Sequence, residues 1–273
     1  MILCKNCSSD NTKTLQTNCL YTLVKCNNCA FYFKNNGEVD YDSLNETDYS
    51  CYNFNRKKEV KDLDAAIRKH CKKAIINLIE IGSGISSILN ELSQLRYKVI
   101  GIEPNKDAVQ ISQNEFPHIN VINNYFNSKL ITNDGVDIIL MYDVIEHLEP
   151  DNEVFMEISK FMSQDTLLIL KSGNPLSLNA RLSFTRWSYI FGNQHISFYS
   201  SFALNLFCKN KNLELIKYYK FRHAYGGISI IKLFKNLIKF IFKICMIETL
   251  IKKDYQIDLA NDHFIAVIRK NRV

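Results

Sequence analysis

The architecture of this chain follows from one segment, Ile76-Asn-Leu-Ile-Glu80-Ile-Gly82-Ser-Gly84-Ile-Ser-Ser-Ile-Leu-Asn-Glu-Leu92. An apolar run ends in an acid, turns on two glycines and restarts with helical spacing, which predicts a strand, a tight turn and a helix. Such a unit brings backbone N–H groups and a helix N-terminus close to its ligand, so the segment indicates a nucleotide-like ligand. Taken alone, the Gly-x-Gly turn would fit an ordinary connection equally well.

Two further segments narrow the ligand. A dinucleotide fingerprint needs a third glycine where this chain has Ser87, so a pyrophosphate is disfavoured. Lys98-Val-Ile-Gly-Ile-Glu103 predicts a second strand whose terminal carboxylate is placed to bind both hydroxyls of a ribose. The segment from Gly135 to Glu149 predicts another strand, which runs into an acidic stretch containing His147.

Together these segments resemble the class I S-adenosylmethionine-dependent methyltransferases. The match covers the first motif, Glu80-Ile-Gly-Ser-Gly84, the ribose-binding acid Glu103, and the signature Tyr142-Asp-Val-Ile-Glu-His-Leu148 after the fourth strand. The resemblance implies S-adenosylmethionine as the cofactor. The cofactor site that it implies consists of Glu80, Gly82, Ser83, Gly84, Glu103, Asn124 and Asp143. At Asn124, where the family usually has an acid or amide near the adenine, an ordinary surface asparagine is an equal alternative.

Strand and helix patterns alternate along the chain, which predicts an α/β fold with a mainly parallel, doubly wound sheet. The strands are expected at residues 76–81, 99–103, 120–122, 136–142, 166–171, 213–221 and 263–269. The family resemblance implies a Rossmann-like sheet of seven strands with the last one antiparallel. We divide the chain into a zinc ribbon (1–38), a connector and helix (39–72) and a methyltransferase domain (73–273).

Four cysteines in the first part of the chain form two Cys-x-x-Cys pairs, Cys4 with Cys7 and Cys26 with Cys29. This spacing is typical of a structural, tetrahedral Zn²⁺ site with no open position, with unmetallated or redox-active thiols as the alternatives. Cys19 lies between the pairs and could compete as a ligand, but it is not needed to complete the site. Nine cysteines in a chain without an export-signal pattern favour the cytoplasm, where disulfides do not persist.

The predicted ribbon also raises RNA binding as an alternative. Its lysines are scattered rather than clustered, and Phe31, Tyr32 and Phe33 are expected to pack against the neighbouring domain rather than stack on bases. The order of ribbon, Tyr-rich connector and core resembles bacterial methyltransferases that are often encoded with sugar and surface-polysaccharide genes. That resemblance implies a connector lying over the cofactor, with Tyr49 or Tyr52 closing the substrate site, although tyrosines also serve in interdomain packing.

Two histidines are candidates for a catalytic base. Methyl transfer from a sulfonium is an in-line displacement, and a base near an acceptor hydroxyl takes its proton as the new bond forms. The subgroup resemblance implies that His195 follows the fifth strand, opens a helix and faces the acceptor, which makes it the first candidate. His147, at the end of the fourth strand, is the second. Either histidine could instead have a packing or helix-capping role.

The segment between the fifth strand and His195 is long for a connector, which favours a lid or a binding element. It carries Arg181 and Arg186, whose guanidinium groups suit phosphate oxygens, although a plain surface charge is an equal alternative for each. The net charge of +6, from 34 basic and 28 acidic residues, mildly favours anionic partners and requires no nucleic acid.

Residues 228–251 are rich in apolar side chains, and their number is sufficient for a membrane span. Four lysines instead share one helical face of this segment, at Lys232, Lys235, Lys239 and Lys243. They predict an amphipathic helix that packs on the core, on a second copy of the chain in a homodimer, or weakly on a membrane surface.

The whole sequence predicts a cytoplasmic S-adenosylmethionine-dependent methyltransferase with a structural zinc ion. The expected reaction is O-methylation of a small phosphorylated or nucleotide-activated, sugar-type intermediate of surface (capsule) polysaccharide biosynthesis. Carbon methylation of a nucleotide-linked keto-sugar is the nearest alternative, because a cleft histidine can also remove a proton next to a carbonyl. RNA methylation through the ribbon comes next. A non-enzymatic, cofactor-binding partner protein is disfavoured by the presence of both motif acids.

Overall fold

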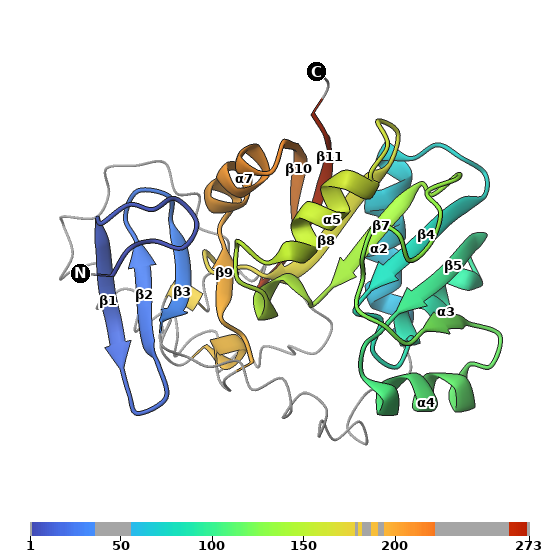
Figure 1. Cartoon of the computed structure of the whole chain (residues 1–273), viewed down its shortest axis with the longest axis horizontal. Coiled ribbons are helices and arrows are strands. Elements are labelled where there is room, and N and C mark those ends of the chain that lie inside the picture. Colours follow the sequence, from blue (N-terminus) through green and yellow to red (C-terminus); the bar gives the residue numbers. More distant parts are fainter. Residues whose placement is uncertain are drawn as a thin grey trace.

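The computed structural model describes residues 2–35, 56–177, 180–181, 187–190, 194–221 and 262–271. Its strands form a seven-stranded sheet and a four-stranded sheet, which lie next to each other (Figure 1). Several predicted features lie outside the described residues: the connector up to residue 55 with Tyr49 and Tyr52, Arg186, and the segment 228–251. Within the described ranges, each helix is too short or too polar to span a membrane.

The large sheet is doubly wound, as the alternation of strand and helix patterns predicts. Its strands are β4 (Ile76–Ile81), β5 (Tyr97–Ile102), β6 (Asn120–Ile122), β7 (Ile138–Tyr142), β8 (Leu167–Gly173), β10 (Leu213–Phe221) and β11 (His263–Lys270). They lie in the order β10-β11-β8-β7-β4-β5-β6. The strands β4 to β8 pair in parallel, whereas β11 runs antiparallel to both β8 and β10. The predicted seven-stranded sheet with an antiparallel last strand is therefore confirmed.

Helices cover both faces of this sheet, because its strands send apolar side chains alternately to two cores. The helices are α2 (Lys57–His70), α3 (Ser87–Ser93), α4 (Lys106–Glu115), α5 (Glu153–Phe161) and α7 (Ser201–Asn210). On one face, α5 and α7 pack against strand residues such as Ile79 and Met141. On the other face, α2 and α3 pack against Leu78 and Leu140. The strands of the sheet are thus buried from both sides, and their ends are left to form a site.

The smaller sheet joins the amino-terminal ribbon to the segment after residue 194 (Figure 1). Its strands are β1 (Thr12–Thr17), β2 (Thr22–Cys26), β3 (Phe31–Asn35) and β9 (Ser197–Tyr199), all antiparallel to their neighbours. Phe31 and Phe33 of β3 are fully buried, and their core is continuous with the α5 and α7 side of the large sheet. The ribbon aromatics therefore pack inward, as predicted.

Strand β9 was not predicted from the sequence. The sequence places a helix directly after His195, whereas β9 separates this histidine from α7 and pairs with the edge of the ribbon. A strand of three residues is too short to show a period of two, so only the pairing with β3 identifies it.

Candidate active site

A cavity of about 480 Å³ lies at the carboxyl ends of β4 and β7, where doubly wound sheets hold their ligands. The residues that line it include Glu80, Gly82, Ser83, Gly84, Asp143, Glu146, His147, Tyr189, His195 and His263. The structure thus brings together both candidate bases and the predicted cofactor residues, except Glu103 and Asn124.

The turn after β4 requires glycine at Gly82. Its φ of +72° lies in the left-handed region, and a Cβ atom there would lie 2.7 Å from Cγ2 of Val144. Gly84 has a φ of +51°, and among the described residues no atom beyond its chain neighbours lies within 4 Å of the position that its Cβ would take. The turn therefore touches the segment after β7 at one glycine and leaves open space at the other.

Glu80 and Ser83 offer polar atoms that the protein does not satisfy. Only 2% of Glu80 is exposed, and its Oε2 has no hydrogen-bond partner among the described residues, nor has Oγ of Ser83. Burial, followed by the charge of Glu103, raises the pKa of Glu80 well above its ordinary value. Because buried polar atoms are normally paired, these two atoms on the cavity wall fit a ligand that donates hydrogen bonds.

Glu103 supports the glycine turn instead of lining the cavity. Its carboxylate accepts hydrogen bonds from the backbone N–H of Gly84, at 2.8 Å, and of Asn105, at 2.9 Å. Burial raises its pKa, and the two backbone hydrogen bonds oppose that rise. Asn124 and Arg181 are exposed and also lie outside the lining. The expected roles of these residues toward ribose, adenine and phosphate stay predictions.

Asp143 follows β7 with a φ of +54°, a strained conformation for a residue with a side chain. Its carboxylate forms an ion pair with the fully buried Lys171 and accepts a hydrogen bond of 3.1 Å from the hydroxyl of Tyr189. This hydroxyl has one proton, which it shares between the carboxylates of Asp143 and Glu146. Burial, and next the charge of Asp143, raises the pKa of Glu146 to about 8. Two carboxylates thus share this end of the cavity with a lysine that is paired to one of them.

His147 and His195 lie beside each other, with ring centroids 4.7 Å apart. Nδ1 of His147 lies 3.0 Å from the carbonyl oxygen of Gln194, and Nδ1 of His195 lies 2.6 Å from that of Tyr189. A carbonyl oxygen only accepts, so each neutral ring carries its proton on Nδ1 and a lone pair on Nε2. Burial lowers the pKa of both rings, and together with His147 it lowers that of His195 to about 3. Both imidazoles are therefore neutral near pH 7.

A backbone bridge at Ile196 holds the two histidines in position. The N–H of Lys34 in the ribbon donates to the carbonyl oxygen of Ile196 at 2.9 Å, and the N–H of Ile196 donates to that of Glu146 at 2.8 Å. His195 and His147 are the chain neighbours of the bridged residues. The ribbon sheet is thus connected directly to the acceptor end of the cavity.

Several lining residues were not predicted as site residues, among them Arg56, Tyr189 and His263. The ring of Tyr189 lies 4.4 Å from that of His195 and meets the ring of His263 edge-on at 5.4 Å. No local motif marks these residues, and His263 reaches the cavity because the last strand inserts between β8 and β10. Only the predicted strand order could have pointed to its position.

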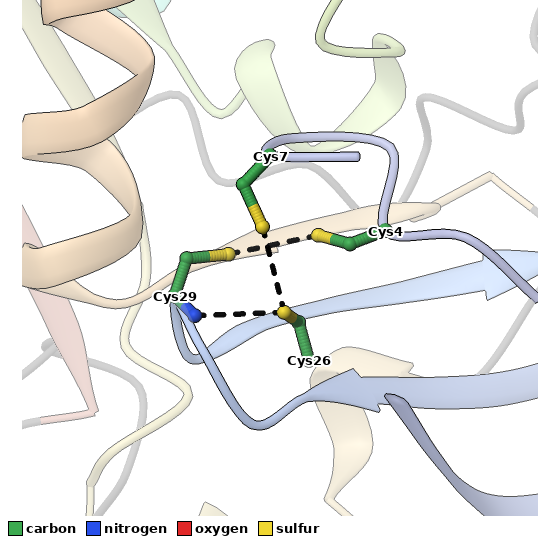
Figure 2. A group of neighbouring side chains, drawn as sticks. All are labelled: Cys4, Cys7, Cys26 and Cys29. Atoms are coloured by element: carbon green, nitrogen blue, oxygen red, sulfur yellow. Dashed lines mark hydrogen bonds between the residues drawn. The ribbon is translucent and has the colours of Figure 1, made fainter. Parts of the chain in front are cut away.

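The four ribbon cysteines point toward one another (Figure 2). The sulfur atoms of Cys4 and Cys29 lie 3.6 Å apart, as do those of Cys7 and Cys26, and all four lie within 4.8 Å of one another. A tetrahedral Zn²⁺ site with bonds of about 2.3 Å separates its sulfurs by roughly 3.8 Å. The cluster therefore fits a zinc ribbon, and the exposed Cys19 is not part of it.

Comparison with known families identifies the class of this chain. A family model described as "Methyltransferase domain" matches residues 52–218, which is more than half of the sequence. The chain therefore belongs to the methyltransferase-domain family. The order and directions of its seven strands are those of the class I S-adenosylmethionine-dependent methyltransferase fold.

Individual relatives agree with this class. An uncharacterized methyltransferase of Alkaliphilus oremlandii (strain OhILAs) is 28% identical over 94 residues, which are 34% of this chain and 43% of that relative. The match thus spans less than half the length of the curated relative. A SAM dependent methyltransferase from Archaeoglobus fulgidus has a TM-score of 0.53 at 16% identity, over 79% of this chain and 95% of its own. The plantazolicin methyltransferase BpumL in complex with SAH has a TM-score of 0.50 at 16% identity, and the match covers 80% of this chain and 85% of BpumL.

Replacing Gly82 tests the close approach of the turn to Val144. We expect Gly82→Ala to lower the free energy of unfolding by more than the roughly 1–2 kcal/mol of a left-handed alanine, because its Cβ also collides with Val144. Gly84→Ala, with open space around its Cβ, should show the left-handed cost alone. Urea denaturation measures the free energy of unfolding of both variants. When Val144→Ala is added to Gly82→Ala, the part of the loss in unfolding free energy that comes from the collision should disappear. If Gly82→Ala and Gly84→Ala lose the same unfolding free energy, the contact with Val144 is contradicted.

The cysteine cluster predicts a metal content that depends on four particular thiols. We expect the purified chain to contain one zinc per molecule and Cys26→Ser to lose it, because three thiolates leave the tetrahedral site incomplete. Cys19→Ser is the matched control and should keep its zinc. Elemental analysis after dialysis measures the content. Equal zinc in both variants would show that the ion is held elsewhere.

Proposed function

We propose that this chain transfers a methyl group from S-adenosylmethionine to an oxygen of a small phosphorylated or nucleotide-activated acceptor. We infer a sugar-type intermediate of surface polysaccharide biosynthesis as that acceptor, and the cytoplasm as the location. One observation carries the proposal: the glycine turn and the neutral pair His147 and His195 line the same cavity. In that turn region Oε2 of Glu80 and Oγ of Ser83 have no hydrogen-bond partner among the described residues. The turn region fits the cofactor and the histidine pair fits the acceptor.

The turn side of the cavity has the properties that this cofactor requires. When bound, S-adenosylmethionine supplies a methyl group made electrophilic by its sulfonium. Oε2 of Glu80 would hold the positively charged amino group, and the open side of Gly84 leaves room for the nucleoside. Glu103 has used two of its roughly four acceptor positions on backbone N–H groups, so it keeps capacity for ribose hydroxyls. These residues bind and orient the cofactor, and none of them takes part in a covalent step.

The histidine side would activate the acceptor. Both rings present an unprotonated Nε2, because their Nδ1 atoms donate to backbone carbonyls. In the simplest form of the reaction, an acceptor hydroxyl gives its proton to Nε2 of His195 as its oxygen attacks the methyl carbon, and His147 occupies the second position beside it. The fixed rings also supply alignment, on which an in-line displacement depends.

Two features support a small acceptor over RNA. The cavity volume of about 480 Å³ lies in the range of small-molecule sites. Phe31 and Phe33 of the ribbon are buried and cannot stack on bases. The net charge of +6 suits an anionic acceptor of either kind. Because methyltransferases of one fold accept different substrates, the fold leaves the acceptor open. Carbon methylation of a keto-sugar uses the same histidines and is the second candidate.

The histidine assignment predicts a separation of turnover from cofactor affinity. We expect His195→Ala to lower kcat at least about 100-fold, because proton removal or an equivalent activation of the acceptor is lost. The affinity for S-adenosylhomocysteine should change less than about threefold, because the cofactor is held at the other side of the cavity. His118→Ala, an exposed histidine outside the cavity, is the control. Radiolabelled methyl transfer to a panel of sugar phosphates and nucleotide sugars, with unphosphorylated sugars beside them, measures turnover.

Two outcomes would contradict this assignment. If His195→Ala loses cofactor affinity in proportion to turnover, the histidine belongs to the cofactor side. If unphosphorylated sugars are methylated at the same rate as their phosphorylated counterparts, the proposed class of acceptor is wrong.

A further inference from the structure

Three side chains at the acceptor end of the cavity have the arrangement of metal ligands. One carboxylate oxygen of Glu146 and one ring nitrogen each of His147 and His195 lie within 4.8 Å of one another. They come from two separate parts of the chain, the segment after β7 and the segment before β9. Their spacing is fixed by the backbone hydrogen bond between Ile196 and Glu146.

The contacts behind the two histidines are those that orient metal-binding imidazoles. A metal-ligating histidine almost always donates its other ring N–H to a carbonyl or carboxylate, which fixes the tautomer. Here Nδ1 of His147 and Nδ1 of His195 both donate to backbone carbonyl oxygens. The two Nε2 lone pairs are therefore available on rings whose centroids lie 4.7 Å apart. Neither ring donates to the other through Nδ1.

Glu146 supplies the third donor. Its side chain is fully buried, and its oxygens accept hydrogen bonds from the hydroxyls of Ser172, at 2.9 Å, and Tyr189. A carboxylate has roughly four acceptor positions, so positions remain for a cation. Lys171 forms its ion pair with Asp143 and not with Glu146. Within the described part of the chain Glu146 has no ion pair of its own, and a buried carboxylate of that kind favours a positive charge nearby.

We propose that Glu146, His147 and His195 bind one divalent transition-metal cation in the cavity. Two imidazoles and one carboxylate are a donor set for first-row divalent cations such as Mn²⁺ and Co²⁺, and three protein ligands leave coordination positions open. Because all three residues line the cavity, an acceptor in the cavity could occupy these positions. The site is separate from the ribbon cysteines, which are soft sulfur donors that already complete a tetrahedral set.

The role of this cation rests on the proposed methyl transfer, whereas its binding does not. A hydroxyl coordinated to a divalent cation loses its proton more easily, as metal-bound water does. The proton would go to water, the oxygen electron pair would form the bond to the methyl carbon, and the electron pair of the breaking C–S bond would stay on sulfur. In this arrangement His195 holds the cation instead of accepting the proton. Turnover would still require both histidines.

A metal titration tests the site without any measurement of activity. The full chain is first loaded with one equivalent of zinc per molecule, which the four thiolates take in preference to the histidine site, and unbound zinc is removed by dialysis. Mn²⁺ is then added, and the free ion is counted by electron paramagnetic resonance. We expect one bound Mn²⁺ per chain, and at least about tenfold weaker binding in His147→Ala and in His195→Ala. His118→Ala should bind as the wild type does.

Glu146→Gln provides an independent variant, because it keeps the side-chain volume and replaces the carboxyl group by a neutral amide, which is a poor ligand for such cations. It should also weaken Mn²⁺ binding at least about tenfold, with an unchanged circular dichroism spectrum. The titration is repeated with Co²⁺, whose visible absorption should lack thiolate charge-transfer bands. Absence of saturable binding of both ions up to about 1 mM, or binding that all three variants retain, would overturn the proposal.

A titration of the same samples with S-adenosylhomocysteine separates the two proposals. If it binds and neither metal ion does, the metal site is wrong and the methyltransferase assignment stands. If the metal ions bind and S-adenosylhomocysteine does not, the metal site stands and the methyltransferase assignment is wrong.

Discussion

Two backbone hydrogen bonds at Ile196 connect three parts of the chain that are far apart in sequence. The carbonyl oxygen of Ile196 accepts from Lys34 in the ribbon, and its N–H donates to Glu146 after β7. Ile196 is 1% exposed, so neither of these two backbone groups has water as an alternative partner in the folded protein. The positions of His147 and His195 therefore depend on the ribbon. The ribbon thus has a structural role: it holds the histidine side of the cavity in place.

A second contact joins the two ends of the cavity. Gly82, in the turn after β4, approaches Val144, which stands between Asp143 and Glu146 in the segment after β7. The cofactor side and the acceptor side are thus held against each other by packing within the sheet. An in-line methyl transfer requires such a fixed relation, since its rate depends on alignment more than on covalent help from the protein.

The sequence predicts those parts of the site that depend on local patterns. The Gly82 turn, the seven strands and the four ribbon cysteines each follow from short-range spacing, and the structure confirms the sheet and the convergence of the cysteines. Strand β9, Tyr189 and His263 depend on partners distant in the chain and have no local signal. The pairing of Asp143 with Lys171 likewise arises only because β7 and β8 are parallel neighbours. Long-range register, rather than propensity, decides these features.

The central claim is that the cavity between Glu80 and the histidine pair binds S-adenosylmethionine. Isothermal titration of the zinc-loaded chain with this cofactor tests it most directly. The account predicts saturable binding of one molecule per chain, weakened at least about tenfold by Glu80→Gln because the charge facing the amino group is removed. Absence of saturable binding, or equal binding by Glu80→Gln, would contradict it.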